Sequence, residues 1–181
     1  MATKELQLTG FDPGGTSGYV LLVVPRSCIF GDEDPQILEW DYGELNGPEP
    51  GQVTQLASLC RTWQGLAYKT GPAVVSEKWD ADPTFKNADE EQYSPVRING
   101  MLQYVWSEHP RLVGDATLHF QSRTQAFRAF NDERLRQRGL WTEGSAHIRA
   151  ATKHALCALR RARESVQFAH ELWPYPPSGL H

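Results

Sequence analysis

Two acidic side chains stand where short apolar runs end. Asp12 follows "LTGF" and precedes the glycine-rich turn "PGGTSG", while Glu77 follows the run "AVVS". An acid at the end of a buried strand opens on a cleft, and acids that converge in one cleft suit hard divalent cations. Each residue also has a simpler interpretation. Asp12 is a common turn former before Pro-Gly, and Glu77 could be one half of a surface ion pair with Lys78.

A second group of chemically capable residues lies in the stretch "HIRAATKHALCAL" near the C-terminus. At about 100° per residue, His147, Ala150 and His154 fall within roughly 60° of one another on a predicted helix. A histidine in that position can orient a water molecule, exchange a proton or bind a metal ion. The alternative interpretation is that both histidines are packing residues at the edge of the helix.

The elements that must position these residues follow from hydrophobic periodicity and from turn residues, and their predicted order is βββαβαβαα. Strands are predicted at residues 5–12, 19–24, 36–45, 72–80 and 116–122. Helices are predicted at residues 50–70, 94–109 and 146–169, with a basic helix or loop at residues 124–139 and a polar loop at residues 80–93. Asp12 and Glu77 would then end two neighbouring central strands.

Strands that alternate with helices after an antiparallel start predict an α/β fold, in which a mixed five-stranded sheet carries helices on both faces. With 181 residues, the chain is expected to form one domain over residues 1–181. Residues 170–181 are expected to be an extended tail, because "WPYPPSGLH" cannot continue a helix.

The composition indicates in which cellular compartment the protein is expected. No apolar run approaches the roughly 18 residues of a membrane span. The N-terminus lacks the basic start and apolar centre of a secretory signal. The three cysteines are scattered without a CxxC pair, which favours reduced thiols. We therefore expect a cytoplasmic protein with no membrane partner.

The order of the elements, with an acid in the first strand and another ending the fourth, resembles the RNase H-like nuclease fold. Three segments, "TGFDPGGTSGYVLL", "VVSEKWD" and "HIRAATKHALCAL", resemble RuvC-type Holliday junction resolvases, particularly small phage-encoded ones. The resemblance implies an endonuclease that resolves four-way or other branched DNA junctions, using two Mg²⁺ ions per active site with Mn²⁺ as a substitute. It also implies that Asp12 and Glu77 are catalytic metal ligands. From its chemistry and position on the helix, we expect His147 to orient the attacking water or bind a metal ion, and His154 to assist catalysis from a later turn.

The last helix departs from the pattern of this family. These resolvases carry an acid three residues after a histidine or another acid, whereas His147 is followed at that distance by Ala150. We hypothesise that Ala150 replaces a catalytic, metal-binding Asp, through deliberate inactivation or natural loss. The chain as it stands is then expected to have little or no activity.

DNA binding has to come from local basic patches, because the formal net charge of −4 gives no overall attraction to a polyanion. Five candidates lie near the predicted cleft or on the last helix. They are Lys78, Lys86, Arg97, Arg149 and Lys153. A branched substrate with two symmetric strands suits a two-fold homodimer, and the resemblance implies an interface around Gly100 in "PVRINGMLQYVW". A core helix packed within one chain would show the same pattern.

Other functions share parts of this pattern. The segment "DPGGTSGYV" also looks like the phosphate-binding hairpin of sugar kinases and actin-like ATPases, although no second glycine-rich phosphate motif follows it. A junction-binding protein that has lost catalysis is a further alternative. Other activities of the nuclease superfamily, on flaps or RNA–DNA hybrids, would use the same residues.

Overall fold

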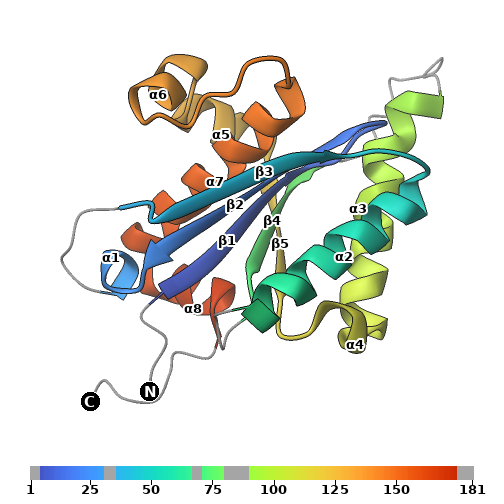
Figure 1. The fold of residues 1–181 in the computed structure, drawn as a ribbon, viewed down its shortest axis with the longest axis horizontal. Helices are drawn as coiled ribbons and strands as arrows, with labels where there is room; N and C mark the ends of the chain where they lie inside the picture. Colours follow the sequence, from blue (N-terminus) through green and yellow to red (C-terminus); the bar gives the residue numbers. More distant parts are fainter. Residues whose placement is uncertain (1–4, 31–35, 67–70, 80–89, 175–181) are drawn as a thin grey trace.

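A twisted mixed sheet forms the centre of the molecule. The computed structural model describes residues 5–30, 36–66, 71–79 and 90–174, which are shown in Figure 1. The strands are β1 (Glu5–Asp12), β2 (Ser17–Pro25), β3 (Glu39–Leu45), β4 (Ala73–Lys78) and β5 (Thr117–Ser122). Their order across the sheet is β3-β2-β1-β4-β5.

Pairing in the sheet changes direction at β1. The strands β1, β2 and β3 pair antiparallel, whereas β4 and β5 run parallel to β1. The parallel strands are joined through helices, as a crossover connection requires. The predicted α/β class, with a mixed five-stranded sheet, is therefore confirmed.

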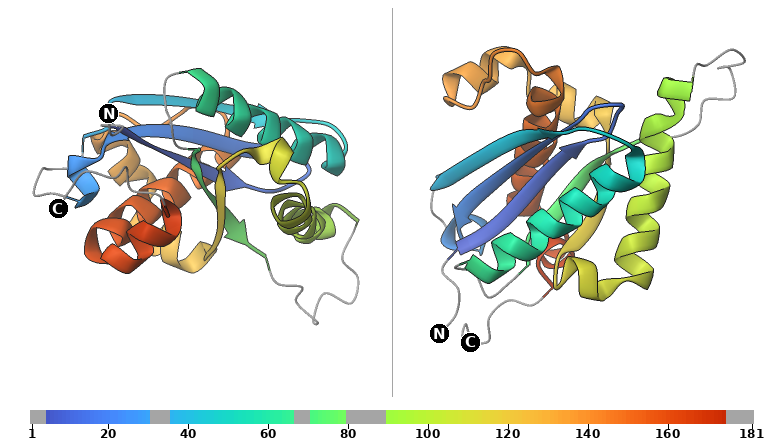
Figure 2. Two further views of the ribbon diagram at one scale, coloured as in Figure 1. Left: turned by 90° about the horizontal axis from the view of Figure 1, so that it is seen from below. Right: turned by 45° about the vertical axis from the view of Figure 1, so that its right-hand side comes forward.

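Helices cover both faces of the sheet, as the two views of Figure 2 show for α2 and α7. One face carries α2 (Glu49–Leu66) and α3 (Glu90–Glu108), followed by the short α4 (Pro110–Val113). The other face carries α5 (Arg123–Ala129), α7 (Ala146–Glu164) and α8 (Val166–Leu172). The remaining described helices are α1 (Ser27–Phe30) and α6 (Asp132–Gln137).

Alternation along β1 divides the core into two layers, because successive side chains of a strand point to opposite faces. Leu6 and Leu8 join the cluster under α5, α7 and α8, whereas Phe11 joins the cluster under α2 and α3. Asp12, one residue after Phe11, therefore faces α7.

Several predicted boundaries were wrong, each for a local reason. Helix α3 begins at Glu90, four residues before the predicted start at residue 94, and holds Pro95 in its interior. The long last helix is broken at Ser165, whose extended backbone ends α7 and whose hydroxyl caps α8. Residues 170–172 are consequently helical, and residues 175–181 of the predicted tail lie outside the described residues.

The basic stretch at residues 124–139 lies in two short helices, α5 and α6. Phe130 and Asn131 separate them, and the side chain of Asn131 caps α6 by accepting a hydrogen bond from the backbone of Arg134. In the part of the chain that the structure describes, no helix is long and apolar enough to cross a membrane.

Candidate active site

Asp12 and Glu77 lie side by side at the carboxyl edge of the central strands. Asp12 ends β1 and Glu77 is the penultimate residue of β4. These parallel strands pair Phe11 with Ser76, so the two acids follow at the next position of the register. Both side chains are buried, with 6% and 1% of their surface exposed, and both point toward α7. The predicted convergence of the two carboxylates is present in the structure.

Two glycines let α7 come close enough to reach these acids. A Cβ atom added to Gly10 would lie 2.0 Å from the carbonyl oxygen of Ala151, and one added to Gly18 would lie 2.3 Å from the carbonyl carbon of His147. Gly18 is also the antiparallel partner of Asp12. Neither glycine was predicted as a site residue, although a glycine inside a strand often marks such a close approach.

The turn between β1 and β2 is held by Gln52, a buried residue of α2. Its amide nitrogen donates to the carbonyl oxygens of Gly15 and Gly47, and its amide oxygen accepts from the hydroxyl of Ser17. This turn borders the site, because a Cβ atom on Gly14 would lie 3.3 Å from the ring of His147. The role of Gln52 could not be predicted from sequence, since its partners lie in two other segments.

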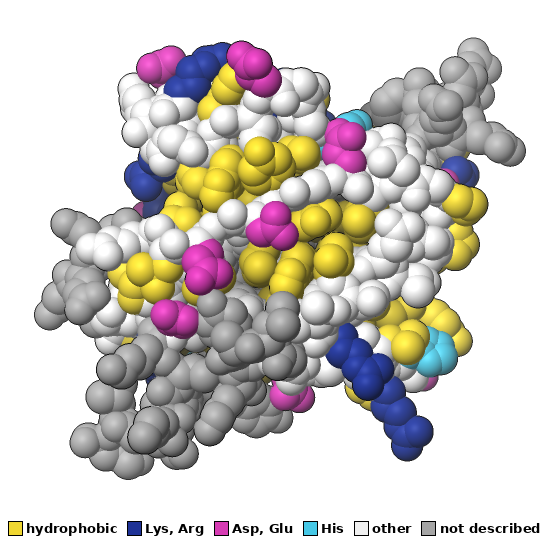
Figure 3. Space-filling view, in the orientation of Figure 1, with side chains coloured by type: hydrophobic (Ala, Val, Ile, Leu, Met, Phe, Trp, Pro, Cys, Tyr) yellow, Lys and Arg dark blue, Asp and Glu magenta, His cyan; other side chains and the backbone are white. Residues whose placement is uncertain are grey.

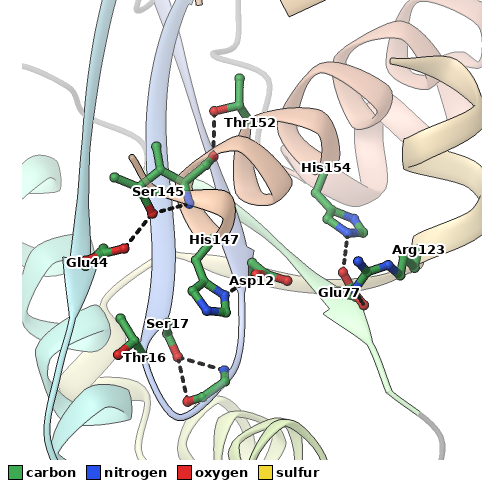
Figure 4. A network of polar contacts seen from close by, with 12 residues as sticks. Asp12, Thr16, Ser17, Glu44, Glu77, Arg123, Ser145, His147, Thr152 and His154 are labelled. Atoms are coloured by element: carbon green, nitrogen blue, oxygen red, sulfur yellow. Dashed lines mark hydrogen bonds and ion pairs between the residues drawn. The ribbon is translucent and has the colours of Figure 1, made fainter. Parts of the chain in front are cut away.

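Each carboxylate is paired with one histidine of α7 (Figure 4). Nδ1 of His147 lies 2.7 Å from Oδ2 of Asp12, and Nε2 of His154 lies 3.1 Å from Oε2 of Glu77. The hydroxyl of Ser145 caps α7 by accepting from the backbone of Ile148, which fixes the first turn that carries His147. The structure thus brings both predicted histidines to the acids.

The surroundings of His154 and Glu77 fix how this pair is oriented. The amide nitrogen of Gln121, on β5, lies 3.2 Å from Nδ1 of His154 and donates there, which assigns the ring proton to Nε2, facing Glu77. Arg123 approaches the other oxygen of Glu77 at 3.5 Å, and Asn99 donates to its backbone carbonyl. Gln121 and Asn99 were not predicted as site residues, because only the tertiary fold brings them to Glu77 and His154.

The electrostatic environment of the two acids differs. Burial is the largest effect on Asp12, and it raises the pKa of this carboxyl. The hydrogen bond from His147 lowers the pKa and the nearby charge of Glu77 raises it, so the pKa stays above its usual value. Burial also acts to raise the pKa of Glu77, but the hydrogen bond from His154, with the charge of Arg123, holds that pKa below its usual value. The hydrogen bond to Asp12 raises the pKa of His147.

Ala150 lies on α7 between the turns that carry His147 and His154. Its side chain is 5% exposed. Although it is buried, it belongs to neither of the two hydrophobic clusters that the described residues form, whereas its neighbour Ala151 does. Ala150 is thus a small buried side chain about one helical turn from each of the two histidines that pair with the acids.

The predicted DNA-binding residues lie in different surroundings. Lys78 is exposed at the end of β4, and Lys86 lies outside the described residues. Arg97 pairs with Glu49 through two nitrogens, at 2.6 to 2.9 Å. On α7, the ammonium group of Lys153 is buried 2.6 Å from Asp132, and Arg149 donates to the carbonyl of Thr142 at 3.0 Å.

The donor set fits one hard cation better than a complete two-ion site. Within the described ranges, no group of three or more His, Cys, Asp and Glu side chains is placed to hold a metal ion. Two adjacent buried carboxylates nevertheless suit Mg²⁺, which keeps several water ligands and needs only one or two carboxylates. The histidines use one oxygen of each acid, Oδ2 of Asp12 and Oε2 of Glu77.

No protein-family model matches the chain, and no curated protein sequence matches it significantly. Several solved structures, however, are similar to it in fold. The structure of Thermus thermophilus RuvC aligns with a TM-score of 0.57 and 17% identity, over 88% of this chain and 96% of that chain. T. thermophilus RuvC in complex with Holliday junction substrate aligns with a TM-score of 0.56 and 16% identity, over the same shares. At this identity the similarity shows a RuvC-like, RNase H-like fold, which confirms the predicted architecture.

Proposed function

We propose that this chain, which has the RuvC-like fold, is a structure-selective endonuclease for four-way (Holliday) or other branched DNA junctions, inactivated in its present sequence by Ala150. One observation carries the proposal: Asp12 and Glu77 are buried side by side under α7, and Ala150 lies between the histidines that bind them. Similarity to a RuvC structure in complex with Holliday junction substrate supports the substrate class.

Asp12 and Glu77 are the residues that would hold Mg²⁺, or Mn²⁺ in its place. Divalent ions bound there would make a water molecule nucleophilic and stabilise the leaving oxygen of a phosphodiester. A carboxylate at position 150 would add the ligand that a second ion needs. Alanine at this position leaves the helix and its packing intact but removes that ligand.

His147 is the residue best placed to move a proton. Its Nδ1 donates to Asp12, and 42% of its side chain is exposed. The remaining ring nitrogen, Nε2, can therefore accept a proton from a water molecule when the ring is neutral. Asp12 orients the ring for this step, as a carboxylate does for a general-base histidine.

His154 has a different role, because it is fully buried. With Gln121 on one side of its ring and Glu77 on the other, it keeps the Glu77 carboxylate in one orientation. It is a positioning residue for Glu77. Arg123 at the mouth of the site has 56% of its side chain exposed and would contact the phosphate that enters beside Glu77.

A homodimer is the expected assembly for a symmetric junction. The outer side of α3 has room for a second copy, since a Cβ atom on Gly100 would meet no atom within 4 Å. Tyr104, one turn later on that side, is 59% exposed. These features support the interface predicted around Gly100, and sedimentation of the wild-type protein and Tyr104→Glu would detect the dimer and its loss.

Two alternatives are weaker. A junction-binding protein without catalysis would explain why both acids are already paired with histidines, and it predicts that Ala150→Asp stays inactive. An ATP-binding function is disfavoured by the ring of His147, which packs against the turn at Gly14 where a phosphate would have to lie. An increase in the melting temperature of the protein on adding ATP would support the ATP-binding function.

The decisive experiment offers Ala150→Asp a set of labelled substrates with Mg²⁺ or Mn²⁺. Four-way junctions, flaps, linear duplexes and RNA–DNA hybrids share the same cleavage chemistry, so the preferred substrate identifies the substrate class. We expect four-way junctions to be cleaved fastest. Equal cleavage of all four substrates would contradict structure selectivity.

A further inference from the structure

Positive charge is concentrated in one segment of the chain. Residues 123–164 carry ten of the 18 Lys and Arg residues but only four of the 22 Asp and Glu residues. This segment forms α5, α6 and α7, which lie together in Figure 1. The face shown in Figure 3, by contrast, displays acidic side chains over β3, which contains Glu39, Asp41 and Glu44. An acidic protein therefore has a local basic surface.

An open groove of about 410 Å³ lies between α5 and α7 on this basic surface. Gln125, Arg128 and Ala129 line it from α5, and Cys157, Arg160 and Arg161 line it from α7. Its lining thus contains three guanidinium groups and no carboxylate. A concave site with this charge is suited to an anion.

One arginine of the groove is held in place by other side chains, whereas the other two make few contacts with the rest of the protein. Arg161 donates to the side chain of Gln121 at 3.3 Å and stacks on the ring of Phe168 at 4.0 Å. Arg128 is exposed and makes no hydrogen bond or ion pair with any other described residue. Arg160 has a long contact, 3.6 Å, to the exposed Glu164, and its guanidinium carbon lies 5.9 Å from the centre of the Phe130 ring. Two guanidinium groups can therefore turn to a ligand beside a third that is fixed.

The groove continues directly from the candidate active site. Cys157 lies one helical turn after His154 on α7, and Arg161 lies two turns after it, about 10 Å along the axis. Arg123, which contacts Glu77, begins α5, the other wall of the groove. Because phosphates of one DNA strand follow each other every 3.4 Å or so along the axis, about 10 Å corresponds to about three nucleotides.

We infer that this groove binds the phosphate backbone of a duplex arm of the DNA substrate, about three nucleotides from the phosphate at the active site. The inference rests on the proposed function. Arginine is the side chain that best matches phosphate, since its planar guanidinium group donates two parallel hydrogen bonds. Contacts of this kind fix the position of the duplex and carry no base specificity.

The test is DNA binding by the full-length protein, which needs no catalysis. Fluorescence anisotropy with a labelled four-way junction measures the affinity of the wild type and of Arg128→Gln/Arg160→Gln at NaCl concentrations from about 50 to 200 mM. We expect the affinity to fall about tenfold and the slope of log affinity against log salt to decrease by about 2. The matched control is Arg61→Gln/Arg111→Gln, which removes two exposed positive charges from α2 and α4, and it should bind within about twofold of the wild type.

The outcomes separate this inference from the proposed function. If the wild type binds junctions and the groove variant, with an unchanged melting temperature, binds with the same affinity and salt slope, the inference is wrong and the proposed function survives. If the groove variant alone loses affinity but Ala150→Asp never cleaves DNA, the groove is supported and the proposed function is wrong. Failure of the wild type to bind any DNA overturns both.

Discussion

Nε2 of His154 lies 3.1 Å from Oε2 of Glu77, and both side chains are almost completely buried. Asp12 has an equivalent partner in His147. A buried carboxylate without a hydrogen-bond partner destabilises a folded protein, so each histidine offsets part of the cost of placing an acid in the site. The two histidines therefore help to keep the two acids together in the site.

This arrangement predicts the effect of removing the buried histidine. His154→Ala should lower the free energy of unfolding by about 1–3 kcal/mol, because Glu77 and Gln121 lose a buried partner. Urea unfolding near neutral pH measures the change. His109→Ala, at an exposed position, should have an effect within about 0.5 kcal/mol. Equal effects of the two substitutions would show that the pairing with Glu77 contributes no stability.

The close approach of α7 to the sheet predicts a second stability change. Gly10→Ala should destabilise the protein by about 2 kcal/mol or more, because the new methyl group meets the backbone of Ala151 and α7 has to move. The matched control is Gly51→Ala in α2, where a Cβ atom has open space. It should stabilise the protein by about 0.5–1 kcal/mol, since glycine is unfavourable inside a helix. Thermal unfolding would contradict the packing described here if Gly10→Ala were neutral.

Asp132 predicts a dependence of stability on pH. Its hydrogen bond to Lys153 and the charges of Lys153 and Arg149 hold the pKa of this carboxyl below its usual value. A lowered pKa in the folded state contributes stability above the ordinary pKa of about 4, and this contribution is lost as the pH falls through the folded-state pKa. Asp132→Asn should therefore cost about 1 kcal/mol at pH values near 6, because 42% of the Asp132 side chain is exposed but Lys153 is left buried. Urea unfolding at a series of pH values should show the difference shrinking below about pH 4; a constant difference would argue against the ion pair.

Local patterns predicted much of the fold and the backbone of the site. Asp12 and Glu77 end apolar runs, and the positions of those runs alone placed both acids at strand ends. His147 and His154 were found because residues seven apart return to the same side of a helix. Ala150 was singled out by the resemblance to RuvC-type resolvases, which carry an acid three residues after the position of His147.

Partners that are distant in sequence could not be predicted in this way. Which histidine binds which acid depends on the register of β1 with β4 and on the height of α7 over the sheet. Gln52, Gln121 and Asn99 are ordinary polar residues in sequence, and only the fold gives them partners in the site. Ser165 was missed for another reason, because the apolar periodicity continues across the break it introduces.

The measurement that tests the central claim most directly is Mg²⁺-dependent cleavage of a labelled four-way junction by Ala150→Asp. We predict that this variant cleaves at least about a hundredfold faster than the wild-type chain, and that adding Asp12→Asn to it abolishes the gain. Folding and junction binding are checked on the same samples by circular dichroism and anisotropy. A folded Ala150→Asp protein that binds the junction and cleaves no faster than the wild type would contradict the claim that position 150 has lost a catalytic carboxylate.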